Sequence, residues 1–153
     1  HPYGYLIVDG RLTPHADEAP IVRRIVADFL DGKPARQIAR ALNEAEILAP
    51  AASKAAQMRA GGREPSKGMS TWWSTSAVTR LLRNPVLVGW ATHNGRIVLG
   101  PDGEPVSFGE GILTPGEHAR VLVELERRTA IVQQSPTKTR AAGSRTGGGE
   151  RRT

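Results

Sequence analysis

The chain has 153 residues, enough for one domain with a hydrophobic core, and it contains no cysteine. A disulfide, a thiolate zinc site and a thiol nucleophile are therefore excluded. The formal net charge is +6, and arginine supplies 17 of the 21 basic residues. Because guanidinium groups match phosphate oxygens, this composition favours a phosphate-rich partner over an acidic small molecule.

The two ends of the chain suggest a fragment with a basic tail. The sequence starts at His1 rather than methionine and has neither a signal peptide nor an apolar run long enough to span a membrane. We therefore expect a piece of a longer protein without membrane contact. Residues 131–153 contain five basic residues and one acidic residue, so they carry +4 of the net charge. We expect 1–131 to form the domain and 132–153 a disordered basic linker or tail.

The first elements predicted are a hairpin and a helix. Residues 3–12 favour two strands joined by a turn at Asp9-Gly10. Asp17 is then predicted to cap a helix that ends at Gly32. Its apolar residues repeat at helical spacing and form one broad buried stripe.

A second helix is predicted from Pro34 to about Glu46. Its inward residues would be Ala35, Ile38, Ala39, Leu42 and Ala45, and its outward residues Arg36, Gln37, Arg40, Asn43 and Glu44. For Asn43, a capping or local backbone hydrogen bond is favoured over a functional role. The stretch 51–71 is rich in Ala, Gly and Ser, and we expect a mobile basic loop there. Residues 51–60 could instead hold a helical turn or extend the preceding helix.

A short third helix is predicted at 74–83, with Ser74 as its N-cap. It should end at Asn84, because Pro85 disfavours helical conformation in the residue before it. Its apolar face comprises Val78, Leu81 and Leu82, and its opposite face comprises Ser76, Thr79, Arg80 and Arg83. Such a helix has the dimensions and chemistry of a major-groove reader. Taken alone, it is more simply an ordinary solvated surface helix.

A small antiparallel β meander and a C-terminal helix complete the expected α+β fold, which has a helical core of three helices. The meander would comprise a strand at 86–93, a turn at Asn94-Gly95, a return at 97–99 and a further turn at Asp102-Gly103. Thr114 to Glu117 form a capping box that opens the last helix, which should end near Ile131.

No residue pattern supports catalysis within this chain. The four histidines share no metal-ligand spacing, and the stretch 62–68 lacks the glycine and hydroxyl residue of a phosphate loop. We therefore expect no catalytic residue, metal, cofactor or small-molecule substrate. The second and third predicted helices do carry side chains typical of nucleic-acid binding, because Arg and Gln can read base edges and Ser and Thr can contact phosphate. Trp73 is predicted to anchor the core beside them, and Trp72 to be exposed.

Several short motifs occur in a fixed order along residues 2–128. They are Pro2-Tyr-Gly-Tyr5, Glu18-Ala19, Val22-Arg23, Ile25, Gly32, Ile38-Ala39, Leu42-Asn43, Ile47, Pro50, Trp73, Val78, Leu81-Leu-Arg-Asn-Pro85, Gly89, Ile112-Leu113 and Arg127-Arg128. This ordered set resembles the recombinase domain of the large serine recombinases, the family of phage integrases and transposition resolvases. The sequence departs from that pattern at Leu87, where the family often has tyrosine, and in the long 51–71 stretch.

The resemblance implies a DNA-binding module that follows a serine catalytic domain and usually precedes a zinc ribbon. The nucleophilic serine would lie in an N-terminal domain outside this chain, so Ser70, Ser74 and Ser76 are not expected to be nucleophiles. The full-length protein would be a cytoplasmic DNA recombinase, associated with the nucleoid through DNA and acting as a dimer or tetramer on it.

We expect sequence-specific binding to double-stranded DNA at one half of a recombination attachment site. Major-groove reading is assigned to Ser76, Thr79, Arg80 and Arg83, phosphate binding to Lys33, Arg36, Arg40 and Lys67, and further DNA contacts to Gln37 and Trp72. Two alternatives remain open: a helix-turn-helix-like regulator or RNA-binding module, and a protein-interaction domain with an incidental basic tail.

Overall fold

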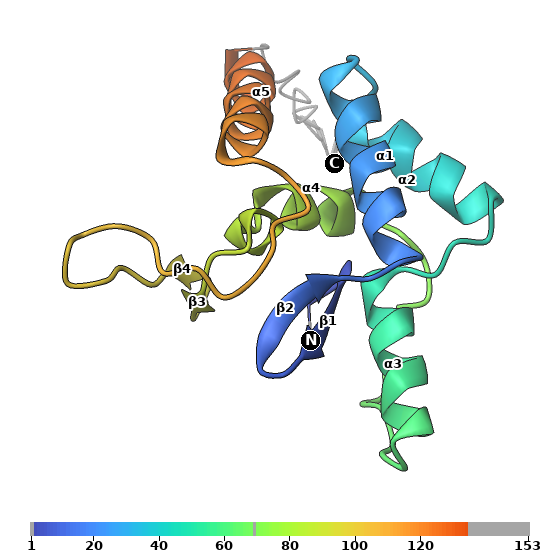
Figure 1. The fold of residues 1–153 in the computed structure, drawn as a ribbon. Helices are drawn as coiled ribbons and strands as arrows, with labels where there is room; N and C mark the ends of the chain where they lie inside the picture. Colours follow the sequence, from blue (N-terminus) through green and yellow to red (C-terminus); the bar gives the residue numbers. More distant parts are fainter. Residues whose placement is uncertain (1, 69, 135–153) are drawn as a thin grey trace, which may run out of the picture.

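The computed structural model describes residues 2–68 and 70–134, and its α+β class confirms the expectation (Figure 1). Its elements are β1 (Tyr5–Val8), β2 (Arg11–Pro14), α1 (Glu18–Leu30), α2 (Ala35–Glu44), α3 (Pro50–Ala60), α4 (Thr75–Arg83), the 3₁₀ helix η1 (Pro85–Val88), β3 (Thr92–His93), β4 (Arg96–Ile97) and α5 (Pro115–Gln134). Helix α5 runs past the expected end at Ile131, and the predicted tail beyond Gln134 lies outside the described residues.

The N-terminal hairpin forms as predicted. Strands β1 and β2 pair antiparallel, and both turn residues, Asp9 and Gly10, have positive φ angles of 49° and 73°. A two-residue turn of this kind matches the right-handed twist of the strands. The buried Tyr5 hydroxyl accepts a hydrogen bond from the Ile112 backbone N–H at 3.0 Å, and burial raises the pKa of Tyr5 to about 12. The hairpin is thereby fastened to the segment before α5.

Helix α1 begins with a cap that the sequence did not predict. The Asp17 side chain makes no capping hydrogen bond. Instead, Nδ1 of His15 accepts hydrogen bonds from the backbone N–H groups of Asp17 and Glu18, at 3.0 and 3.3 Å. The Glu18 carboxylate turns inward, where it accepts hydrogen bonds from the Gly4 N–H and the Ser53 hydroxyl. Glu18 therefore joins the hairpin, α1 and α3.

The expected loop over 51–71 is wrong in its first half, where the alternative of helical structure at 51–60 holds: these residues belong to helix α3, which is separate from α2. Alanine has the highest helix propensity, and Pro50 occupies the first helical turn, where its missing N–H costs nothing. Ala52 and Ala55 are buried, and the bond from Ser53 to Glu18 fixes the helix against α1. Only 61–71 lacks a helix or strand among the described residues of this stretch.

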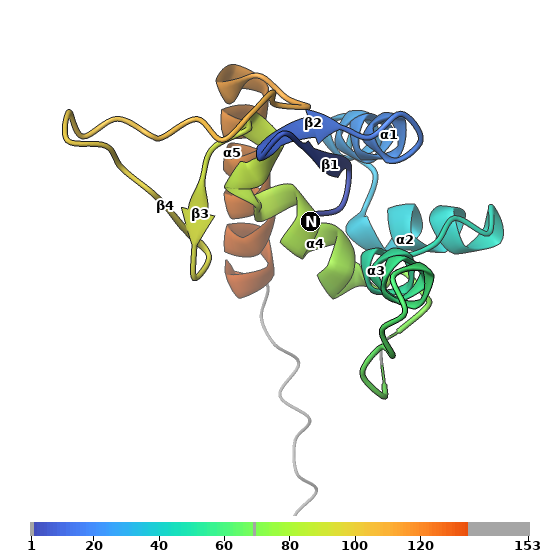
Figure 2. The ribbon, with the colours of Figure 1, turned by 60° about the horizontal axis from the view of Figure 1, so that its bottom comes forward.

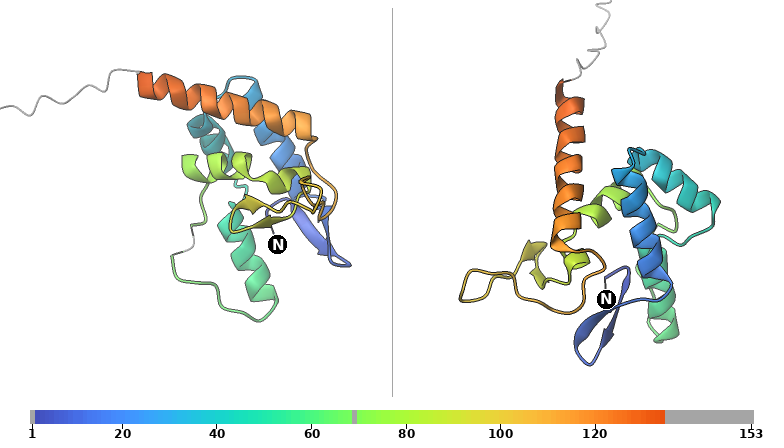
Figure 3. Two further views of the ribbon diagram at one scale, coloured as in Figure 1. Left: turned by 90° about the vertical axis from the view of Figure 1, so that its left-hand side faces the viewer. Right: turned by 45° about the horizontal axis from the view of Figure 1, so that its top comes forward.

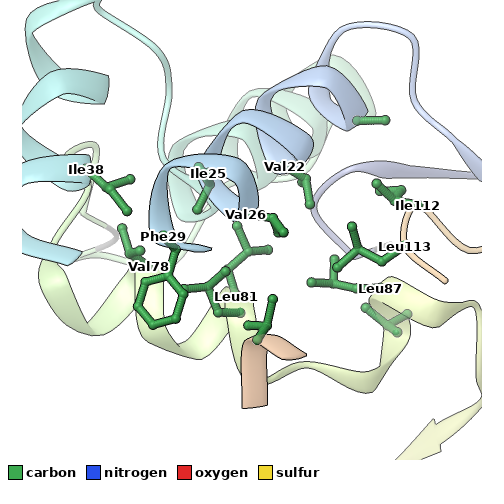
Figure 4. Close-up of a cluster of buried hydrophobic side chains, with 14 of the residues drawn as sticks. Val22, Ile25, Val26, Phe29, Ile38, Val78, Leu81, Leu87, Ile112 and Leu113 are labelled. Atoms are coloured by element: carbon green, nitrogen blue, oxygen red, sulfur yellow. The ribbon is translucent and has the colours of Figure 1, made fainter. Parts of the chain in front are cut away.

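The hydrophobic core lies where α1, α2, α4 and α5 meet, as Figure 4 shows from the side chains that converge there. Helix α1 contributes Val22, Ile25, Val26 and Phe29. The predicted inward residues Ile38, Ala39 and Leu42 of α2 are buried, whereas Ala45 lies beyond the end of the helix and is exposed. The predicted apolar face of α4 is also buried.

Arg128 holds α5 against the turn between α1 and α2. Its guanidinium carbon lies 3.9 Å from the centroid of the Phe29 ring, and its two terminal nitrogens donate to the carbonyls of Phe29 and Lys33 at 2.7 and 2.8 Å. Glu124 accepts hydrogen bonds from Arg127 and Arg128, which lower the pKa of this carboxyl to about 2. Arg128 thus adds a second hydrogen bond to the Phe29 carbonyl, which also accepts the Gly32 N–H at 3.1 Å, and binds the Lys33 carbonyl in the following turn.

The expected strand at 86–93 is wrong in its first half, which is the 3₁₀ helix η1. The Asn84 side chain accepts the Val86 N–H, and Pro85 fills the first position of the turn. Residues 86–88 are all buried, so an apolar run that suggested a strand belongs to a tight buried turn. The predicted Asn94-Gly95 turn does join β3 to β4.

Residues 89–110 form an arm that projects from one side of the molecule, with α3 on the other (Figure 2). At the root of the arm, three backbones approach closely. A Cβ atom at Gly89 would lie 2.5 Å from the Gly109 carbonyl oxygen, one at Gly109 would collide with Leu12, and one at Gly111 would lie 2.6 Å from Val88. Only glycine fits these three positions without a backbone shift.

Candidate nucleic-acid interface

Helix α4 forms as the sequence predicts. The Ser74 hydroxyl accepts the Ala77 N–H at 3.0 Å, and the helix ends at Asn84. Ser76, Arg80 and Arg83 are exposed. Thr79 is half-buried, and its hydroxyl lies within hydrogen-bond distance of the carbonyls of Thr75 and Ser76, so its proton is used within the helix.

The front of α4 borders two separate depressions. Arg80 lines a groove of about 280 Å³ together with Trp72 and Tyr3. Thr79 and Arg83 line a wider groove of about 680 Å³, whose other walls come from the start of α2 and the C-terminal half of α5. The predicted reading residues therefore share one helix face, but Arg80 borders one groove, Thr79 and Arg83 border the other, and Ser76 lines neither of the two.

Helix α2 supplies the second basic surface. Arg36, Gln37 and Arg40 are exposed, and Arg40 pairs with Glu44 at 3.1 Å. Arg36 and Arg40 border a shallow groove of about 570 Å³ that also contains Trp72 and the first residues of α4. The structure thus brings the basic side of α2 and the start of α4 to the same groove.

The two lysines predicted to hold phosphates lie apart from this groove. Lys33 sits in the turn between α1 and α2 and pairs with Asp28 at 3.1 Å. Lys67 lies beside α3 in a groove that includes Arg59 and Glu64. Neither lysine lines the grooves on either edge of α4.

The two adjacent tryptophans have opposite environments, as predicted. Trp72 is 65% exposed and lines the grooves on both the α2 side and the Arg80 side of α4. Trp73 is 3% exposed and donates its indole N–H to the Ile47 carbonyl at 3.1 Å. Trp72 is therefore a large apolar surface between the two predicted basic surfaces.

Asn43 is the residue whose role the sequence reasoning missed. Its Oδ1 accepts the Trp73 backbone N–H at 2.8 Å, and its Nδ2 donates to the Trp73 carbonyl at 2.9 Å. The expected local hydrogen bond is wrong, because these bonds join residues 30 positions apart. Two sequence signals pointed to it: the position next to a buried leucine, and the place of Leu42-Asn43 among the ordered motifs.

Two further properties bear on the function of the described part of the chain. Among residues 2–68 and 70–134, no His, Asp or Glu residues gather in threes that could bind a metal ion. Within the same residues, every helix is too short or too polar to cross a membrane.

A comparison with solved structures places this fold beside one found on DNA. A chain in the crystal structure of an LSR–DNA complex is 15% identical with a TM-score of 0.52, and the match covers 88% of the present chain and 35% of that chain. A chain from a structure on the sequence requirements of the Listeria innocua prophage attP site gives a TM-score of 0.47 at 15% identity, covering 88% and 47%. The present chain thus spans about a third to a half of these proteins.

The sequence comparisons give a family. No curated protein sequence matches the chain significantly. The family model described as Recombinase matches residues 16–128, which include α1 to α4 and most of α5. This match covers well over half of the chain and confirms the resemblance drawn from the ordered motifs: the chain belongs to the recombinase family.

Proposed function

We propose that this chain is the DNA-binding domain of a site-specific serine recombinase and recognises one half of an attachment site in double-stranded DNA. The observation that carries the proposal is helix α4, whose apolar side is buried while Ser76, Arg80 and Arg83 are exposed. A helix of this size fits the major groove, where arginine can bind guanine with two hydrogen bonds. The resemblance to a chain from an LSR–DNA complex supports a duplex as the partner.

In this proposal α2 anchors the duplex backbone while α4 reads bases. Arg36 and Arg40 border the groove that contains the start of α4, so both helices can contact one duplex. The pair formed by Arg40 and Glu44 is exposed on both sides and contributes little to stability. Arg40 can therefore exchange Glu44 for a phosphate at small cost. Trp72 supplies an apolar contact beside these charges.

The first test removes one reading side chain. We expect Arg80→Ala to weaken binding to the preferred duplex by about 1–3 kcal/mol and to relax preference at one base position. The preferred duplex is obtained by selection from a random pool at fixed salt, and the selection is repeated with the variant. Arg120→Ala, an exposed change on α5, is the matched control and should select the wild-type sequence.

Arg83→Ala extends this test to the other edge of α4. If Arg80→Ala and Arg83→Ala both select the same sequence as the wild type, α4 is not the reading helix. A preference for structured RNA over any duplex in the same selection would instead favour an RNA-binding module.

We also propose that the catalytic serine lies in another part of the full-length protein, which acts as a dimer or tetramer on DNA in the cytoplasm. This chain should then bind DNA without cutting it. Purified chain incubated with supercoiled plasmid and with a labelled duplex, with and without divalent metal, should produce no nick. Nicking that persists through further purification would contradict this division of roles.

A further inference from the structure

Asn43 holds the residue that precedes helix α4. Its amide makes two hydrogen bonds to the backbone of Trp73, accepting the N–H at 2.8 Å and donating to the carbonyl at 2.9 Å. An amide side chain that pairs with both polar groups of one residue fixes that residue's orientation as well as its position. Trp73 directly precedes Ser74, the N-cap of α4. The start of α4 is therefore tied to the last turn of α2.

The two hydrogen bonds join the ends of a long connection between α2 and α4. Between Asn43 and Trp73 the chain leaves α2, forms α3, passes through 61–71 and returns. The two ends of such a long connection can adopt many positions relative to each other unless other contacts fix them. The two Asn43 hydrogen bonds supply that restraint directly. They add a directional polar tie to the apolar packing of α4 against α2, which by itself does not fix the orientation of the first turn of α4.

The Trp73 side chain completes the same joint. Its indole N–H donates to the Ile47 carbonyl at 3.1 Å, and the Tyr3 ring meets it edge-on with centroids 5.5 Å apart. Trp72, the adjacent residue, stays 65% exposed. One fixed residue thus places both the exposed indole of Trp72 and the first turn of α4.

We propose that Asn43 is a positioning residue for DNA recognition. This inference rests on the proposed function. Asn43 itself lines the groove that Arg36, Arg40 and Trp72 share with the start of α4, so the joint lies between the anchoring and the reading side chains. Losing it leaves every charge in place but lets α4 shift relative to α2. Non-specific attraction to phosphates should survive this shift, whereas base reading should not, because base reading requires fixed geometry.

Two variants and one control test the role. Asn43→Ala removes both hydrogen bonds, and Asn43→Asp keeps an acceptor for the Trp73 N–H but cannot donate to its carbonyl. Leu12→Ala, a change at a buried residue of β2, truncates the same hydrophobic core but removes no hydrogen bond to Trp73. For each protein, dissociation constants are measured for the selected duplex and for a scrambled duplex, at a temperature where circular dichroism shows a folded chain. Hydrogen exchange of the Trp73 amide is followed in parallel.

We expect Asn43→Ala to lose about tenfold of its preference for the selected duplex while binding the scrambled duplex within about twofold of wild type. Asn43→Asp should also lose preference, because a carboxylate oxygen would face the Trp73 carbonyl in place of the amide donor. Its added negative charge weakens binding to both duplexes and so cancels from their ratio. The Trp73 amide should exchange faster in Asn43→Ala, which removes its acceptor, than in Asn43→Asp, which keeps one. Leu12→Ala should keep the wild-type preference. If Asn43→Ala does not fold, the same comparison is decided on Asn43→Asp.

Three results would overturn the inference. An unchanged preference in Asn43→Ala, or in Asn43→Asp where only that variant folds, removes the positioning role. An equal loss of preference in Leu12→Ala makes the effect one of general stability. If the wild-type chain prefers no duplex, the proposed function is wrong and the role of Asn43 falls with it. If the wild type has a preference and the variants retain it, only the role of Asn43 is wrong.

Discussion

Replacing Val78 with aspartate should unfold the domain. Val78 is fully buried on the inner face of α4, within the core of Figure 4. An aspartate there must either bury an unpaired charge or take up a proton, and both cost several kcal/mol. Small domains are stable by about 5–15 kcal/mol, so a loss of this size removes most or all of the folded population. The expected result is a far-UV circular dichroism spectrum without the helical signal and no cooperative thermal transition.

Ser76→Asp is the matched control. Ser76 lies two residues earlier on the same helix but is exposed, and it lies in the first turn, where a negative charge interacts well with the helix dipole. The free energy of unfolding should change by less than about 1 kcal/mol. A Val78→Asp chain that melts like the wild type would show that α4 does not pack through this face.

DNA affinity should fall steeply as salt concentration rises. Each phosphate contact releases condensed counterions, so about four to six contacts should give a slope of around −4 to −5 in a plot of log K against log salt. A tenfold increase in salt would then weaken binding by about 10⁴- to 10⁵-fold. Fluorescence anisotropy with a labelled duplex across a salt series measures the slope.

A chain that ends at Gln134 tests where the contacts lie. Residues 131–153 hold +4 of the net charge, so removing most of them should weaken binding and lower the slope. Binding that persists must come from the folded part, as the proposal requires. A flat salt response in the full chain would remove phosphate anchoring, and loss of all binding on truncation would leave only the basic tail as the DNA contact.

The local features of the fold could be predicted where a few neighbouring residues determine them. The Asp9-Gly10 and Asn94-Gly95 turns, the Ser74 cap and the apolar side of α4 all follow from local geometry. The Thr114 hydroxyl accepts the Glu117 N–H at 3.2 Å, as the capping box predicts. The exposed Trp72 and buried Trp73 also followed from the position of Trp73 beside the helix start.

The features that the sequence leaves open depend on partners far along the chain. The alanines of α3 are compatible with either a loop or a helix, and the contact that holds the helix joins Ser53 to Glu18, which are 35 residues apart. Asn43 bonds to Trp73 rather than to its neighbours. Charge predicts Lys33 and Lys67 as phosphate-binding residues, and the fold adds that Lys33 pairs with Asp28 and that Lys67 lines a groove beside α3. Charge predicts a class of partner, whereas position in three dimensions decides which charges can contact it.

Helix α5 extends beyond the rest of the domain in Figure 3, and the arm extends in another direction. The arm is mounted on the domain through main-chain atoms: Leu12 exchanges hydrogen bonds with Phe108 and Glu110, and Phe108 donates to the Gly89 carbonyl. These backbone hydrogen bonds do not depend on which side chains the arm carries, provided that the glycines at its root are kept. Residues can therefore be added, removed or exchanged at the exposed Asn94-Gly95 turn of this arm without altering the register at the root, which makes that turn a suitable insertion point for a reporter tag.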